Sequence, residues 1–353
     1  MLTDLTISAK ALLGFLRREV GREHALPWHQ LAVRSAWLMG RSQSMAPVLS
    51  HCGSALSDDY VRVLSRPTLP YLSTAFPTAV WRELLADHCG FVGRHFGNRL
   101  YEQVATTGVM LWSGEERAAG VTVHLGGPCP HREGGLTLVM RLDGLPIYRI
   151  AFSVVRSERI DPKHAAIGWC LFVGQVQGYP GCFEQIREAT RRCRDIAPPD
   201  LLTSALLGLA GALGIDRILA INLEDCPSYK KMTSLGHHFD YRQFWCERWG
   251  AAFDGQHHRL DLPVSEKPIS EVKANHRGRT LAKRRIKHAV AETVGRQLQA
   301  VLPSPLAAMP AYASNPDGGS MPVAATVPPP AVELKACGFG LRHGSPWLQT
   351  TAP

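Results

Sequence analysis

Residues 135–178 constrain the fold most strongly. Residues 135–155 read GLTLVMRLDGLPIYRIAFSVV, two strand-like runs that meet at Asp143 and Gly144. An Asp-Gly pair between apolar runs is typical of a tight β-hairpin. Residues 169–178 form a third strand-like run, which ends in glycine. The segment therefore predicts consecutive strands of one β-sheet.

A crossover follows the third strand. Residues 182–195 form a charged amphipathic helical stretch, and residues 201–214 form one that is apolar nearly all round. The Pro-Pro-Asp run at 198–200 is predicted to end the first helix and to cap the second through Asp200. Residues 217–222 then form a β-branched strand. A strand–helix–helix–strand order predicts that the two strands are parallel neighbours.

The rest of the chain divides by composition. Residues 1–120 predict a helical N-terminal region, with one helix over 80–97. Residues 121–295 predict an α/β core that ends in a basic helix. The Pro/Ala-rich residues 296–353 predict a disordered tail, because they cannot bury enough surface to offset the entropy of ordering. The expected fold class is α/β (α+β), a mixed twisted sheet with a helical N-terminal region.

Composition and charge exclude several classes of protein. The chain has 353 residues, 45% of them hydrophobic, which is enough for a sizeable core. No apolar run is long enough to cross a membrane without a charge, Gly or Pro, and the N-terminus lacks the pattern of a signal peptide. The nine cysteines form no CxxC pair, so the spacing gives no support to a zinc ribbon or a thioredoxin-type motif. Reduced thiols in a cytoplasmic protein are expected. The net charge of +9 favours anionic partners.

Several cysteines and histidines are predicted to serve packing. Cys170, Cys226 and Cys246 have apolar or aromatic neighbours in sequence, where a free thiol behaves as a small hydrophobe. His88 lies on a helical face and is expected to be a hydrogen-bonded core residue rather than a base. The adjacent histidine pairs, at 237–238 and 257–258, do not make a bidentate metal site, because neighbouring side chains on a strand face opposite ways. No metal is expected.

The order of the motifs resembles the VirK/YbjX family of bacterial proteins over roughly residues 50–295. The matching stretches are RPTLPYL, LADHCGFVGRHF, EGGLTLVMRLDGLPIYRIAFSV, FVGQVQG, IREATRR, DLLTSALLGLAGALGI, ILAIN and FDYRQFW. The resemblance implies a role in virulence, intracellular spread and tolerance of antimicrobial peptides, without an agreed biochemical activity. The chain departs from the family at residues 194–199, which read RDIAPP where the family carries His-Gly-Leu-Arg-Pro-Lys.

The turn after the third strand is similar to part of a second family. Residues 175–181 read QVQGYPG before a helix, an order loosely similar to the acyl-CoA loop of the GCN5-related acetyltransferases. The LLxxLxxLAxxLGIxxIxAI pattern that follows also resembles that superfamily's core, although two helices rather than one separate the strands. A glycine turn before a helix presents unpaired backbone N–H groups at a positive dipole end, which suits a pyrophosphate. The alternative is that the glycines only turn the chain.

Together these features predict a GNAT-like site for acyl-CoA or another anionic acyl donor. The donor-binding residues would be Gln175, Gln177, Gly178, Gly181 and Arg187. The resemblance implies that Tyr229 is the general acid that returns a proton to the leaving thiolate. Asn222, at the end of the preceding strand, would position a substrate. The alternatives are packing for Tyr229, a turn cap for Asn222 and a weak surface pair with Glu184 for Arg187.

The basic segment at 273–287 carries seven Lys/Arg and no acid. Its Lys283, Arg284, Arg285 and Lys287 would bind an anionic partner or an anionic membrane face. A nucleic-acid partner is disfavoured, because the segment has few interleaved aromatic residues. A solvated helix is the alternative.

Two functions therefore remain open. The first is a transferase that depends on an acyl donor, favoured by the glycine turn. The second is a non-catalytic factor that binds an envelope-related protein or nucleic acid through the basic segment, favoured by the lack of an identifiable general base.

Overall fold

The computed structural model describes residues 70–129, 132–160, 168–229 and 239–303. Within them, eight strands form one sheet in the order β1-β2-β3-β4-β5-β6-β8-β7. All neighbouring strands are antiparallel except β5 and β6, which are parallel. The strands are β1 (Val109–Ser113), β2 (Val121–Gly126), β3 (Leu136–Leu142), β4 (Leu145–Arg156), β5 (Trp169–Gly178), β6 (Arg217–Ile221), β7 (Ala252–Phe253) and β8 (His257–Asp261).

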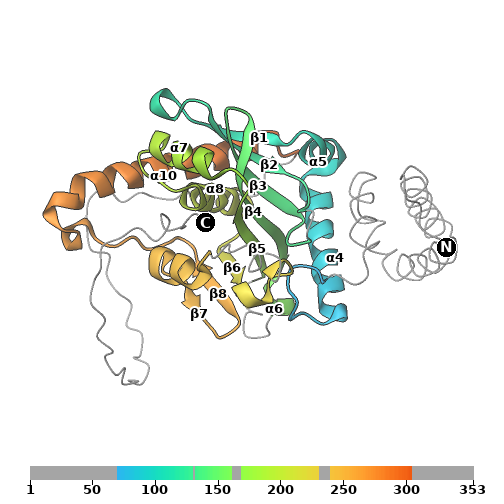
Figure 1. The fold of residues 1–353 in the computed structure, drawn as a ribbon. Coiled ribbons are helices and arrows are strands. Elements are labelled where there is room, and N and C mark those ends of the chain that lie inside the picture. Colours follow the sequence, from blue (N-terminus) through green and yellow to red (C-terminus); the bar gives the residue numbers. More distant parts are fainter. Residues whose placement is uncertain (1–69, 130–131, 161–167, 230–238, 304–353) are drawn as a thin grey trace, which may run out of the picture. The chain divides into compact units, whose positions relative to one another are not determined.

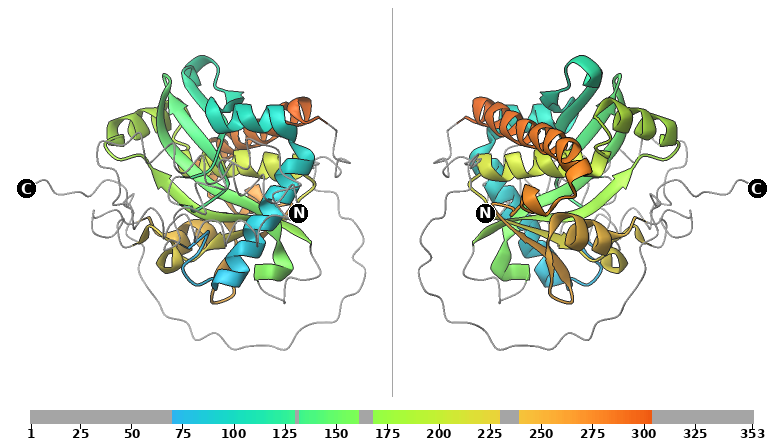
Figure 2. Two further views of the ribbon diagram at one scale, coloured as in Figure 1. Left: turned by 90° about the vertical axis from the view of Figure 1, so that its right-hand side faces the viewer. Right: turned by 90° about the vertical axis from the view of Figure 1, so that its left-hand side faces the viewer.

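Helices cover both faces of this sheet (Figures 1 and 2). On one face, α4 packs against β4 and α5 against β2; on the other, α8 packs across β3, β4 and β5, and α10 lies along α8. The α-helices are α4 (Thr78–His95), α5 (Gly97–Thr106), α6 (Ser157–Ile160), α7 (Phe183–Arg192), α8 (Pro198–Ala212) and α10 (Ala274–Val301). Short helical turns span η1 (Glu116–Ala118), η3 (Leu223–Asp225), η4 (Gln243–Arg248) and η5 (Ile269–Glu271). None of the helices in the described residues has the length and apolar character needed to cross a bilayer.

Helices α8 and α10 cross at very short distance because glycine lies at their contact. A β-carbon at Gly208 of α8 would stand 2.0 Å from the carbonyl oxygen of Ala291 in α10. A β-carbon at Gly295 of α10 would in turn stand 3.1 Å from the carbonyl oxygen of Gly208. Two main chains can approach this closely only where a side chain is missing. The contact therefore holds the largely apolar helix α8 between α10 and the sheet.

The structure confirms the predicted mixed sheet. Strands β3 and β4 form the hairpin, and its Asp143 and Gly144 have φ values of 49° and 84°, the left-handed pair that a type I′ turn needs. Strand β5 covers the predicted residues, and α7 and α8 form the crossover. The predicted parallel pairing follows, with β5 and β6 paired from Leu171–Ile218 to Val173–Ala220.

The start of α8 differs from the prediction. Pro198 and Pro199 lie in its first turn, where the missing N–H groups would have had no helical partner, so proline fits there. The residue before the helix is Ala197, and Asp200 does not cap it. Two prolines suggest a stop because proline interrupts helices everywhere except in this first turn.

The outer parts of the sheet and the chain also differ in detail. Strand β1 lies within the region predicted to be helical, and β7 and β8 have no counterpart among the predicted strands. Helix α10 runs to Val301, past position 296 where the tail is expected to begin. Most of the N-terminal region (1–69) and most of the tail (304–353) lie outside the described residues.

Candidate functional site

Strands β5 and β6 pair through only three residues of each strand. The last parallel pair is Val173–Ala220, and β5 continues to Gly178 alone on that side. The register between β4 and β5 shifts at this point, so that Gly174 forms a bulge. Beyond it, the Tyr241 hydroxyl accepts a hydrogen bond from the Val176 N–H (2.8 Å). The free edge of β5 is thus closed by side chains rather than by a strand.

A buried carboxylate lies beside this bulge. Glu133, in the loop between β2 and β3, has no exposed surface. Its Oε1 accepts hydrogen bonds from the Ser228 N–H and from the Cys226 thiol, each at 3.0 Å. Its Oε2 lies 3.7 Å from the Cys129 thiol. Within the described residues no Lys, Arg or His forms an ion pair with Glu133. Burying a charge without such a partner costs several kcal/mol.

Glycines on either side hold Glu133 in this place. A β-carbon at Gly174 would stand 2.1 Å from the Glu133 carbonyl oxygen, and one at Gly134 would stand 2.3 Å from the Phe152 nitrogen. The N–H of Gly135 donates to the Ser153 hydroxyl at 2.9 Å. The Glu-Gly-Gly run therefore lies in main-chain contact with β4 and β5, and the position of the carboxylate follows from that contact.

A polar chain connects the buried carboxylate to the surface. Gln175 is fully buried, and its amide nitrogen donates to the Ser228 hydroxyl (3.3 Å) and to Oε1 of Gln177 (2.7 Å). Its Oε1 accepts from Arg149 Nε at 2.7 Å. Arg149 and Gln177 are both half-buried, so the chain ends near solvent. We refer to Cys129, Glu133, Gln175, Cys226 and Ser228 as the carboxyl cluster.

The electrostatics of the carboxyl cluster keep its thiol protonated. Burial and the negative charge of Glu133 raise the pKa of Cys226 well above the usual thiol value. The thiol can therefore donate its hydrogen to the carboxylate. Cys226 is buried in the core, as predicted, but its thiol also makes a polar contact with Glu133 that the prediction did not include. No group of His, Cys, Asp and Glu in the described part of the chain could hold a metal ion.

His88 and the remaining cysteines play other roles. The Val154 N–H donates to Nδ1 of His88 at 3.2 Å, and burial lowers the pKa of His88 to about 4. This confirms the prediction of a hydrogen-bonded core histidine. Cys170 is fully buried, as expected, whereas Cys246 lies 3.4 Å from Nδ1 of His258. All seven described cysteines are free thiols.

The predicted glycine turn is present at the end of β5. The strand ends at Gly178, and α7 begins at Phe183. Gly181 is exposed, has φ 77° and has no atom within 4 Å of a β-carbon placed on it. A β-carbon at Gly178 would instead meet Cδ1 of Ile186 at 3.0 Å. Packing against α7 therefore accounts for Gly178, while Gly181 faces open space.

Tyr229 lies near the carboxyl cluster. Its N–H donates to the Cys226 carbonyl at 2.9 Å, and its ring is half-buried against the core. It directly follows Ser228 in the chain. Of the predicted site residues, Gln175, Gln177 and Tyr229 thus lie at or beside one buried polar group.

Arg187 and Asn222 are placed differently. Arg187 is exposed and its Nη1 lies 3.4 Å from Oε1 of Glu184, a surface pair that contributes little. Asn222 precedes η3, makes no side-chain capping bond, and accepts the Asp225 N–H through its carbonyl (3.1 Å). Within the described residues neither side chain is hydrogen-bonded to the carboxyl cluster.

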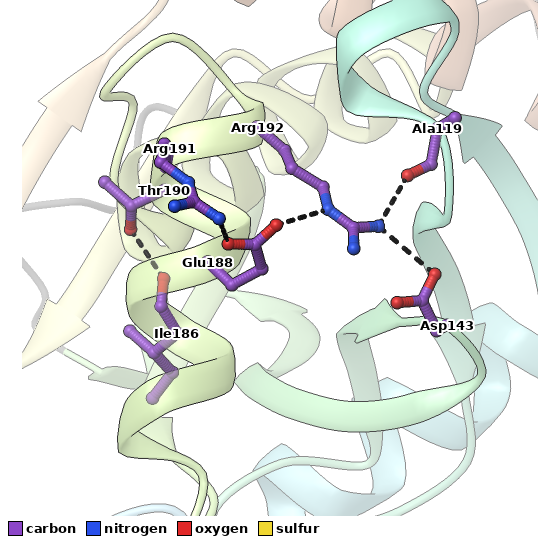
Figure 3. Close-up of polar contacts among 7 residues, drawn as sticks. All are labelled: Ala119, Asp143, Ile186, Glu188, Thr190, Arg191 and Arg192. Carbon is purple, nitrogen blue, oxygen red and sulfur yellow. Dashed lines mark hydrogen bonds and ion pairs between the residues drawn. The ribbon is translucent and has the colours of Figure 1, made fainter.

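Helix α7, which begins after the glycine turn, is fastened to two hairpins through Arg192 (Figure 3). Arg192 Nη1 donates to the Ala119 carbonyl (2.9 Å) and contacts Oδ1 of Asp143 (3.2 Å), while its Nε donates to Glu188 (2.8 Å). A β-carbon at Gly120 would stand 2.9 Å from Arg192 Nη1. The guanidinium therefore fixes the end of α7 against the turns beside β2 and β3.

Most of the basic residues predicted to bind an anion are engaged inside the molecule. Arg285 is exposed. The other three have partners: Lys283 donates to the Asp195 carbonyl (2.6 Å), Arg284 pairs with Glu266 (3.0 Å), and Lys287 pairs with Asp200 (3.8 Å) and lies 4.4 Å above the Trp249 ring. Asp200 also pairs with Arg248 at 2.7 Å. These contacts fasten α10 to its neighbours.

Sequence reasoning missed Glu133 and the role of Cys226. Glu133 belongs to no catalytic motif and lies in a loop. A signal was nevertheless present, because a charged residue directly before two glycines and a mostly apolar strand lies where burial is to be expected. No comparable signal marks Cys226, whose partner is remote in the sequence.

Comparison with known proteins assigns the chain to a family. A family described as "Protein of unknown function (DUF535)" matches residues 29–300. The chain belongs to this family. The "Uncharacterized protein YbjX" of Escherichia coli (strain K12) is 26% identical over 152 residues, which are 41% of this chain and 44% of that protein. The chain thus matches less than half the length of this relative.

Membership of this family confirms the VirK/YbjX resemblance. No solved structure matches the chain. The resemblance to GCN5-related acetyltransferases has no counterpart among these matches and stays a prediction.

Proposed function

We propose that the chain is an acyltransferase that uses an anionic acyl donor of the acyl-CoA type. The observation that carries the proposal is that the parallel pairing of β5 with β6 ends at Val173, while β5 continues to Gly178. In sheets with parallel strands, ligands bind beyond the carboxyl ends of those strands. Here that region contains a buried carboxylate, two glutamines and a tyrosine, rather than an apolar core alone.

The donor would bind at the turn between β5 and α7. Gly181 leaves open space there, and the first N–H groups of α7 lie at the positive end of a ten-residue helix. A phosphate or pyrophosphate is stabilised at such an end. The negative charge of Glu184, in the first turn of α7, disfavours an anion there, but Glu184 forms an ion pair with Arg187. The Arg192 contacts keep this helix in a fixed position, which favours binding.

The acyl group would then lie toward Gln177 and Tyr229. Both residues are half-buried; Gln177 accepts a hydrogen bond from Gln175, and Tyr229 directly follows Ser228 in the chain. The Tyr229 hydroxyl would return a proton to the leaving thiolate, and Gln177 would orient the acyl carbonyl. Most of the rate would come from holding the donor and the acceptor together.

The experiment is a binding and turnover assay on the full chain. Acetyl-CoA and free coenzyme A should raise its melting temperature, and ligand at about 100 times its Kd adds roughly 2.7 kcal/mol of stability. Gly181→Glu should remove this stabilisation, because it places a negative charge at the phosphate position. The matched control is Gly255→Glu, an exposed loop glycine that also has a positive φ and no nearby atoms. No stabilisation of the wild-type chain by either ligand would refute the proposal.

Tyr229→Phe separates binding from chemistry. It should leave ligand stabilisation intact and slow release of the free thiol. The non-catalytic alternative, binding of an envelope-related protein through the basic segment, predicts no thiol release from any acyl-CoA. The roles in virulence and antimicrobial-peptide tolerance and the cytoplasmic location remain predictions from the resemblance and the composition.

A further inference from the structure

We propose that Cys226 is a nucleophile that carries the acyl group covalently, with Glu133 as its general base. This inference rests on the proposed acyl transfer and names the residue that would receive the acyl group first. It changes the expected reaction from direct transfer to two successive half-reactions.

The first argument is the contact between thiol and carboxylate. Cys226 Sγ lies 3.0 Å from Oε1 of Glu133. A nucleophile within hydrogen-bond reach of a base, with the base oriented by a third group, is the arrangement that covalent catalysis requires. The third group here is the Ser228 N–H, which donates to the same oxygen at 3.0 Å.

The second argument is that this contact distinguishes Cys226 from the other buried thiols. Cys89, Cys170 and Cys193 are also buried and free. Within the described residues no carboxylate lies in hydrogen-bond contact with them. Cys129 faces the second oxygen of Glu133 only at 3.7 Å. A thiol that serves packing alone requires no charged partner, and burying a charged group beside it costs free energy.

The third argument is the supply of hydrogen-bond donors around the sulfur. The Ser228 hydroxyl lies 3.5 Å from Cys226 Sγ, and the amide nitrogen of Gln175 donates to that hydroxyl at 3.3 Å. A carbonyl oxygen becomes negatively charged when sulfur attacks its carbon, and fixed donors stabilise that charge. The Ser228 hydroxyl, held by Gln175, would supply such a donor beside the sulfur.

The chemistry balances without another reactant. Cys226 Sγ attacks the carbonyl carbon of the donor thioester, and its proton moves to Glu133. The bond between the carbonyl carbon and the donor sulfur breaks, the leaving thiolate takes a proton from the Tyr229 hydroxyl, and the proton on Glu133 restores that hydroxyl. The products are an acyl-Cys226 thioester and the free donor thiol. In the second half-reaction an acceptor amine attacks this thioester, and Glu133 takes the amine proton and passes it to the Cys226 sulfur.

The donor would approach the sulfur from the half-buried end of the polar chain. Arg149 and Gln177 both contact Gln175, and neither is fully buried. Cys226 itself is only 1% exposed. Cys182 and Cys246 are more accessible, so a reagent that acylated thiols without guidance would modify those two first.

The test is acid-quenched mass spectrometry of the full chain after incubation with acetyl-CoA. We expect one acetyl group, mapped to the peptide that contains Cys226. The adduct should disappear in Cys226→Ala and fall at least about tenfold in Glu133→Gln, because loss of a general base costs about 10²–10⁴-fold in rate. Cys193→Ala, a buried thiol without a carboxylate, is the matched control and should keep the adduct. The site of the adduct is mapped on the wild-type chain. That result therefore stands even if one of the variants fails to fold.

The outcomes separate this inference from the proposed function. Stabilisation by acetyl-CoA and release of its thiol, without an adduct on Cys226, would overturn the covalent step and leave the acyltransferase standing. An adduct confined to Cys182 or Cys246 would also overturn it. Absence of stabilisation, thiol release and adduct together would refute both.

Discussion

Gly174 lies directly against the main chain of Glu133, since a β-carbon at residue 174 would stand 2.1 Å from the Glu133 carbonyl oxygen. The bulge in β5 and the loop that carries the buried carboxylate therefore need each other. Neither a side chain at 174 nor a regular strand there would leave room for Glu133 beside Cys226.

Gly174→Ala should displace the Glu133 loop. We expect the free energy of unfolding to fall by about 1–3 kcal/mol, the usual cost of overpacking a core. The comparison is Gly178→Ala, whose new β-carbon meets no main-chain atom among its nearest neighbours, but the flexible end of Ile186 at 3.0 Å and the Tyr148 ring at 3.3 Å. Urea denaturation of both variants measures the difference, and an equal loss in both would contradict the tight contact at Gly174.

Gly208→Ala should separate α8 from α10. Its β-carbon would stand 2.0 Å from the Ala291 carbonyl oxygen, so one helix has to shift, at a cost of about 1–3 kcal/mol. Gly211→Ala lies on the same helix with no atom within 4 Å of the new carbon. That control should instead gain up to about 1 kcal/mol from helix propensity. Thermal unfolding of the pair should show opposite shifts.

Arg192→Ala should loosen α7. Removing the guanidinium takes away its hydrogen bonds to Ala119, Asp143 and Glu188, so we expect a lower melting temperature. Arg191→Ala is the control, because Arg191 is exposed and its contact with Glu188 is a surface pair. Faster hydrogen exchange at the N–H of Asp143 and in α7 should accompany only the first variant.

The basic segment should prove to be part of the fold. Lys287→Gln loses the contacts with Asp200 and the Trp249 ring, and we expect about 1–2 kcal/mol less stability. Arg285→Gln, on the same helix and exposed, should change stability by less than about 0.5 kcal/mol. If both variants unfold like the wild type, the contacts of Lys287 contribute nothing and a solvated helix is the better description.

Acid should destabilise the fold through His88. Its pKa is lowered from 6.5, the ordinary value for histidine, to about 4 in the folded state, so the unfolded chain binds a proton first as the pH falls. Stability from this residue is therefore complete above about pH 6.5 and declines down to about pH 4, by roughly 1.4 kcal/mol per pH unit at most. His88→Asn keeps an acceptor for the Val154 N–H but cannot titrate. The variant should show a flatter pH dependence of unfolding free energy over this window.

The central strands could be predicted because each carries its own local signal. The period of two and the Asp143-Gly144 turn determine the β3–β4 hairpin, and the crossover rule determines the direction of β6. Strands β7 and β8 carry no such signal, since His257-His258-Arg259 is polar and β7 has two residues. Strand β8 forms by pairing with the edge of β6, and β7 pairs with β8. Such pairing depends on the tertiary fold and leaves no local pattern in the sequence.

The candidate site could be predicted only on the strand side. Gln175 and Gln177 can be found because they precede a glycine turn, a local pattern. Glu133 meets Cys226 across 93 residues of sequence, and no local pattern records such a contact. For the same reason the basic residues of α10 look free in the sequence, because their acidic partners lie in other segments.

The parallel pairing of β5 with β6 divides the described sheet into two sections, which are built from successive parts of the chain. Strands β1 to β5 pair strictly in sequence order, and β6, β8 and β7 form a second antiparallel set. The two sets are joined only by the three residue pairs between β5 and β6, which we call the seam. Every other pair of neighbouring strands shares more residue pairs, except β7 with β8 at the edge. Each section keeps its own antiparallel ladder, and the carboxyl cluster lies where the seam ends. Residues from both sections therefore build the cluster, with Gln175 from the first and Cys226 and Ser228 from the segment that follows β6.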